Sequence, residues 1–138
     1  MRGVSWAWWR TACLATLAIV GTSCSRPAPS ADAALVPVTQ AVGTWEGSGD
    51  HTIGFASTSG RFRIRWETRL EPDHTDGRFH VAVHSAVSGR PLQDVVDQQG
   101  PGSGTVNFED DPRPYNLMVT SSGLDWSITV DEVVLVKP

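Results

Sequence analysis

Residues 114–130 read Pro-Tyr-Asn-Leu-Met-Val-Thr-Ser-Ser-Gly-Leu-Asp-Trp-Ser-Ile-Thr-Val, and this stretch decides the fold class. Apolar and polar side chains alternate over 115–120 and again over 126–130, as in β-strands that are buried on one face. Ser121, Ser122 and Gly123 supply turn residues between the two arms. The stretch therefore predicts a β-hairpin. A two-stranded ribbon is only marginally stable alone, so other strands must cover its apolar face.

Further short segments of strand type, separated by turn residues, precede this stretch. They lie at 43–49, 52–56, 61–70, 78–87, 92–98 and 105–108. The segments at 61–70 and 78–87 are expected to form a second hairpin across the polar loop between them. About eight short strands in a domain of roughly 90 residues predict an all-β fold, an antiparallel two-sheet β-sandwich of jelly-roll type.

The first 23 residues have the organisation of an export signal. Arg2 and Arg10 charge the start, residues 11–20 are apolar, and Gly-Thr-Ser-Cys follows at 21–24. The apolar run is about half of the roughly 20 residues that a spanning helix needs. We therefore predict a signal peptide over 1–23 and a location outside the cytoplasm.

The Gly-Thr-Ser-Cys stretch resembles the lipobox of bacterial lipoprotein precursors, in which the cysteine is lipidated and becomes the first mature residue. The resemblance implies a lipid on Cys24 that holds the protein to the outer side of the cytoplasmic membrane. Gly21 stands where the family prefers an aliphatic residue, so ordinary cleavage near 28–30 or 31–33, giving a secreted protein, is the alternative. Cys13 lies in the signal, which leaves Cys24 without an internal disulfide partner.

The composition of residues 24–138 indicates a tether followed by a domain, and the charge balance of the chain disfavours one class of partner. Residues 24–41 are rich in Pro, Ala and Ser and are expected to form a tether, and residues 42–138 are expected to form the sandwich domain. The chain has 11 Lys and Arg against 15 Asp and Glu. This acidic balance disfavours nucleic acid as a partner, because binding to phosphates needs a basic surface.

The strand segments resemble small secreted β-sandwich modules of bacteria and are similar to the bacterial prepeptidase C-terminal domain. The matching residues are Trp-Glu-Gly at 45–47, Tyr-x-Leu-x-Val at 115–119, Gly123 and Trp-x-Ile-x-Val at 126–130. Such modules are usually accessory or binding units without a catalytic set, so the resemblance implies an architecture and suggests a role of that kind.

A row of arginines is the least ordinary surface feature that the sequence predicts. Arg61, Arg63, Arg65 and Arg69 share one phase of the strand at 61–70, opposite its apolar residues. The row could contact an anionic envelope polymer, anionic lipid headgroups or an acidic protein. The alternative is cross-strand pairing with Asp94, Asp97 or Glu109.

Three other candidate sites are weaker. Trp45, flanked by glycines, could be exposed and stack on a glycan. The histidines at 51, 74, 80 and 84 do not have the spacing of a single metal site, and the acidic loops at 71–76 and 109–111 lack the EF-hand spacing for calcium. We therefore expect neither a metal nor a cofactor.

These features predict a non-enzymatic cell-envelope lipoprotein whose sandwich is a structural or interaction module. A glycan-binding module that uses Trp45 is one alternative. A small hydrolase is another, and it would need a histidine brought beside a serine or an aspartate by the fold.

Overall fold

A computed structural model describes residues 34–138 of the chain. The predicted signal peptide and Cys24 lie outside these residues. Eight strands follow one another in this part: β1 (Val36–Ser48), β2 (His51–Ser57), β3 (Arg61–Leu70), β4 (Arg78–Ser85), β5 (Pro91–Gln99), β6 (Gly102–Glu109), β7 (Arg113–Ser122) and β8 (Leu124–Val136). Within this part of the chain, no helix has the length and hydropathy needed to cross a membrane.

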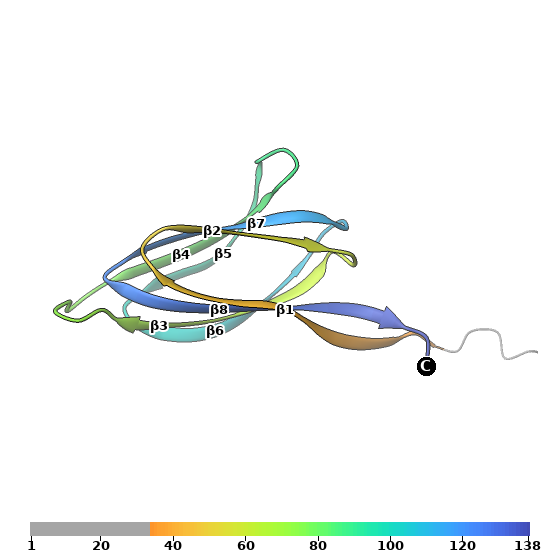
Figure 1. The fold of residues 1–138 in the computed structure, drawn as a ribbon, viewed down its shortest axis with the longest axis horizontal. Coiled ribbons are helices and arrows are strands. Elements are labelled where there is room, and N and C mark those ends of the chain that lie inside the picture. The colour runs from red at the N-terminus through yellow and green to blue at the C-terminus, as the bar shows by residue number, and fades with distance from the viewer. Residues whose placement is uncertain (1–33) are drawn as a thin grey trace, which may run out of the picture. The chain divides into compact units, whose positions relative to one another are not determined.

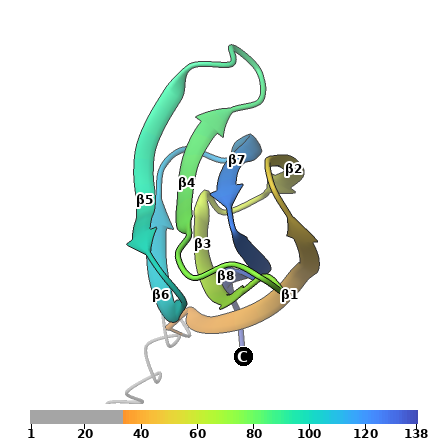
Figure 2. The ribbon, with the colours of Figure 1, turned by 90° about the vertical axis from the view of Figure 1, so that its left-hand side faces the viewer.

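The strands form two four-stranded antiparallel sheets that face each other. The first sheet has the order β1-β8-β3-β6 and the second has the order β2-β7-β4-β5 (Figures 1 and 2). The chain changes sheet at nearly every connection, which is the strand arrangement of an eight-stranded jelly roll. The predicted fold class is confirmed.

The structure corrects the pairing of the predicted hairpins. β7 pairs with β2 and β4, whereas β8 pairs with β1 and β3, so the two arms of 114–130 lie in opposite sheets. β3 and β4, expected to form a hairpin, also lie in different sheets. Because each strand has only one apolar face, two successive strands that arch across the sandwich can pack those faces against each other. In a hairpin, the two strands would lie side by side in one sheet, and their apolar faces would point in the same direction.

Aromatic rings fill one end of the core. The Phe62 ring lies 4.8 Å from that of Phe108 and 5.1 Å from that of Tyr115, centroid to centroid. Tyr115 is fully buried, and its hydroxyl donates a hydrogen bond to the backbone carbonyl of Asp111. Burial of the phenol raises the pKa of Tyr115, and this hydrogen bond fixes the start of β7 against the loop before it.

Glycines opposite tryptophans let the indole rings lie flat on the inner face of the first sheet. Gly47 pairs with Trp126, and a Cβ on Gly47 would lie 2.9 Å from the Trp126 ring. Gly104 pairs with Trp66 in the same way, also with 2.9 Å to the ring. A side chain at either glycine would displace the tryptophan opposite it. Each position therefore requires glycine, and a shift of strand register would break the match.

The first strand begins earlier than the sequence indicated. β1 starts at Val36, inside the stretch 24–41 that was expected to be a tether, and Val36 and Val38 pair with Val136 and Val134 of β8. Pro37 obscured the strand, because proline is rare within sheets. It is tolerated here because β1 is an edge strand.

Candidate functional site: the outer face of the first sheet

The arginine row, defined as Arg61, Arg63, Arg65 and Arg69, lies on the outer face of β3 as its phase predicted. The inward-facing residues of β3, such as Phe62 and Ile64, are buried in the core. The arginine side chains remain 38–79% exposed. The row therefore faces solvent along the outer side of the sheet.

The two ends of the row are paired with single carboxylates. Arg61 Nη2 lies 2.8 Å from Glu109 Oε1 on β6, which is one of the partners the sequence suggested. Arg69 Nη2 lies 2.8 Å from Glu67 Oε1 on its own strand. The other suggested partners, Asp94 and Asp97, lie on β5 in the opposite sheet. The ends of the row thus carry little net charge.

The centre of the row is a cluster in which two arginines share one carboxylate, the Arg63–Arg65–Asp131 cluster. Arg63 Nη2 donates to Asp131 Oδ2 at 3.0 Å, and Arg65 donates to the same oxygen from Nε at 3.1 Å. Arg65 Nη2 lies 3.0 Å from it as well. The Asp131 side chain is only 7% exposed, so the arginines cover it and one positive charge remains in excess.

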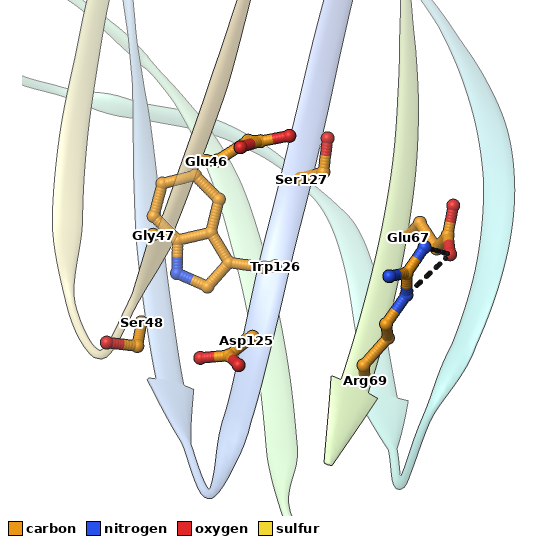
Figure 3. A pocket seen from close by; sticks show the side chains of 8 residues that line it. All are labelled: Glu46, Gly47, Ser48, Glu67, Arg69, Asp125, Trp126 and Ser127. Carbon is orange, nitrogen blue, oxygen red and sulfur yellow. Dashed lines mark hydrogen bonds and ion pairs between the residues drawn. The ribbon is translucent and has the colours of Figure 1, made fainter. Parts of the chain in front are cut away.

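An open depression of about 580 Å³ lies on the outer face near the C-terminal end of β3, beside Arg69 (Figure 3). Three carboxylates line it, those of Glu46, Glu67 and Asp125, together with the guanidinium of Arg69. Negative charge therefore exceeds positive charge here. The outer face is positive at the Arg63–Arg65–Asp131 cluster and negative at this depression.

Among residues 34–138, neither Trp45 nor Trp126 lies fully open on the surface as a platform for a sugar ring. Trp45 is half-buried and packs against the core, because its pairing partner Ile128 faces inward and cross-strand partners share a face. Trp126 lines the depression, but it is 3% exposed and its indole nitrogen donates to the carbonyl of Gly49 at 3.0 Å. The glycan hypothesis based on an exposed Trp45 loses its main support.

The histidines are distributed rather than gathered. His80 Nε2 lies 3.2 Å from Asp94 Oδ1, and His84 Nδ1 lies 3.2 Å from the carbonyl of Gly89. His51 packs its ring beside Trp126. Across residues 34–138, no three His, Cys, Asp or Glu side chains are grouped so that they could hold a metal ion.

The acidic residues at 109–111 form ion pairs with arginines. Arg113 Nη2 lies 3.0 Å from Asp110 Oδ1 and 3.3 Å from Asp111 Oδ2. Together with the Arg61 partner of Glu109, this pairs all three carboxylates of the loop with cations. These carboxylates are therefore already engaged in ion pairs with arginines.

Two neighbouring acidic residues in β8, Asp131 and Glu132, have roles that the residue pattern did not indicate. Asp131 faces outward into the arginine row, and Glu132 faces the end of the core. Glu132 Oε1 accepts hydrogen bonds from the hydroxyls of Ser57, Thr58 and Ser59 and from the Ser59 backbone amide. Burial alone would raise the pKa of Glu132, but these hydrogen bonds outweigh it and lower the pKa. The sequence feature that could have indicated these roles is the pair of acidic residues that directly follows the alternating stretch 126–130.

No protein-family model matches the chain. No curated protein matches it in sequence. Among solved structures, the chain is similar to the CBM22-1 and GH10 modules of endo-1,4-beta-D-xylanase 10B from Clostridium thermocellum, complexed with xylohexaose. The TM-score is 0.36 at 8% identity, and the match covers 55% of this chain and 17% of that chain. A likeness this weak says nothing about a ligand here, and the resemblance to the prepeptidase C-terminal domain stays a prediction.

Proposed function

We propose that the protein is a cell-envelope lipoprotein, held to the membrane by a lipid on Cys24, whose jelly roll is a non-catalytic interaction module. The observation that supports the contact surface is the Arg63–Arg65–Asp131 cluster. Two guanidinium groups there share a single carboxylate on an exposed sheet face. The proposed partner is an anionic envelope polymer or an acidic protein.

The chemistry of the cluster fits such a partner. A guanidinium has five N–H donors in a planar fork that matches carboxylate and phosphate oxygens. Asp131 accepts hydrogen bonds from both arginines through one oxygen, and this holds the two side chains in fixed positions. The arginine side chains remain 38% and 52% exposed. Arg63 Nε is buried, so the N–H groups offered to a ligand are the other ones of the two guanidinium groups. Preorganised donors lose less conformational entropy on binding.

The test is the affinity for dextran sulfate, used as a model polyanion, measured by calorimetry at low and high salt. We expect the double variant Arg63→Gln/Arg65→Gln to lower the affinity about tenfold, which corresponds to about 1.4 kcal/mol. We also expect binding of the unaltered protein to weaken as salt rises. The matched control, Arg78→Gln/Arg90→Gln, removes the same charge away from the cluster. Equal losses in the two double variants would contradict the proposed surface.

A second candidate is a glycan-binding module that uses the depression at the Arg69 end of β3. Glu46, Asp125 and Arg69 give this depression hydrogen-bonding groups that could contact sugar hydroxyls. Binding of soluble glycan fragments from the host envelope, lost in Asp125→Asn and kept in the exposed control Asp94→Asn, would favour this candidate. Fragments that bind neither the unaltered protein nor the control would exclude it.

A further inference from the structure

A two-stranded ribbon extends β1 and β8 beyond the rest of the sandwich. We define this apolar ribbon as residues 35–39 of the N-terminal strand and residues 133–136 of the last strand. Figure 1 shows the two strands running on together past the ends of their neighbours. β3 pairs with β8 only from Leu124 to Glu132, so the ribbon has no third strand.

Both faces of the ribbon are largely apolar, and most of its large apolar side chains are exposed. Val36 and Val38 pair with Val136 and Val134, while Pro37 pairs with Leu135. The exposed fractions of the large side chains are 53% for Leu35, 44% for Val36, 43% for Val38, 49% for Leu135 and 39% for Val136. No charged residue occurs in either strand of the ribbon. A contiguous apolar surface of this kind marks an interaction site.

We infer that the apolar ribbon lies in the membrane interface and forms a second contact with the lipid surface. The inference rests on the proposed lipid anchor at Cys24. The chain enters the ribbon at Leu35, eleven residues after Cys24, and such a segment spans at most about 40 Å. An anchor at Cys24 therefore keeps the ribbon close to the bilayer.

The chemistry of the ribbon favours a lipid surface over a second copy of the chain. Lipid surrounds a protruding tip on both faces, whereas a partner protein would cover one face or one edge. Lys137 follows directly after the ribbon and is exposed, and its ammonium group suits the phosphates of lipid headgroups. The unpaired backbone groups along the ribbon edges need water or headgroups as partners, so the ribbon reaches only the interfacial layer and not the hydrocarbon core.

The experiment places an environment-sensitive dye on the ribbon of the lipidated protein. The predicted mature chain has no cysteine other than Cys24, which the lipid occupies, so Leu135→Cys gives a single labelling position. Val87→Cys, in the loop after β4 and 76% exposed, is the control. Both proteins are reconstituted into vesicles of phosphatidylethanolamine and phosphatidylglycerol with spin-labelled lipid. We expect a blue shift and loss of emission at position 135, and neither at position 87.

The outcomes separate this inference from the proposed function. If the protein floats with the vesicles but the dye at position 135 stays in water, the anchor stands and the ribbon inference is wrong. A blue shift at position 135 without vesicles, together with dimer sedimentation, would assign the ribbon to a second copy and overturn the inference. A mature protein that carries no lipid would refute the proposed anchor, on which the inference rests.

Discussion

The substitution Glu132→Gln tests how the end of the sandwich is held together. Glu132 Oε1 accepts four hydrogen bonds from the last residue of β2 and the turn that follows it, and the residue is 6% exposed. Hydrogen bonds to a charged group contribute about 1.5–3 kcal/mol each against about 1 kcal/mol for neutral ones, and part of this gain offsets desolvation. Glutamine keeps the shape and one acceptor but removes the charge. We expect a loss of about 2 kcal/mol, or roughly 10 °C in Tm.

The dependence on pH identifies the carboxylate as the cause. The pKa of Glu132 is lowered in the folded protein, so its contribution is complete above the ordinary pKa of glutamate and is lost as pH falls through the folded pKa. The difference in unfolding free energy between the unaltered protein and Glu132→Gln should therefore shrink from about pH 5 downward. Urea unfolding followed by circular dichroism measures it.

The control for this prediction is Glu109→Gln. The Glu109 side chain is 68% exposed and forms a surface pair with Arg61, so its loss should change stability by less than about 0.5 kcal/mol. The reasoning is refuted if Glu132→Gln is as stable as the unaltered protein at pH 7. It is also refuted if the difference between the two proteins does not change with pH.

Two further predictions concern the turns and the buried phenol. Tyr115 is the only tyrosine in the chain, and its pKa is raised by burial, so its absorbance at 295 nm should titrate above the ordinary range; an ordinary titration would be the opposite result. The same shift makes stability fall as pH rises above about 10, and Tyr115→Phe should remove that fall. Gly60→Ala should cost roughly 3 kcal/mol in urea unfolding, because its Cβ would lie 1.9 Å from the Asp110 carbonyl oxygen and φ is +70°. Gly49→Ala, with φ +71° and no neighbour within 4 Å, should cost about 1 kcal/mol; equal costs would contradict the role given to Asp110.

The alternation of residues predicted the strands and their inward faces, but it could not predict their partners. Leu117 and Trp126 face inward as the pattern indicated, yet they come from opposite sheets. An arch and a hairpin require the same alternation along the chain. The choice between them depends on contacts far apart in sequence, such as the packing of Asp76 and Gly77 over Gly123.

For the candidate site, too, the sequence predicted which side chains are exposed but not all of their partners. The phase of β3 placed the arginine row on an outer face, and pairing with Glu109 was among the suggested contacts. The central partner, Asp131, was not found, because it comes from β8 and its register with Arg63 is set by the sheet as a whole. A sequence pattern can therefore indicate that a charge is exposed, whereas its net effect depends on the neighbouring strand.

The intact mass of the mature protein, purified from the membrane fraction of its own host, tests the central claim most directly. We expect a mass that corresponds to cleavage before Cys24 plus acyl chains. The Cys24→Ala variant should lack the acyl chains and leave the membrane fraction. An unmodified, soluble protein cleaved at another position would contradict the lipoprotein assignment and, with it, the membrane contact of the apolar ribbon.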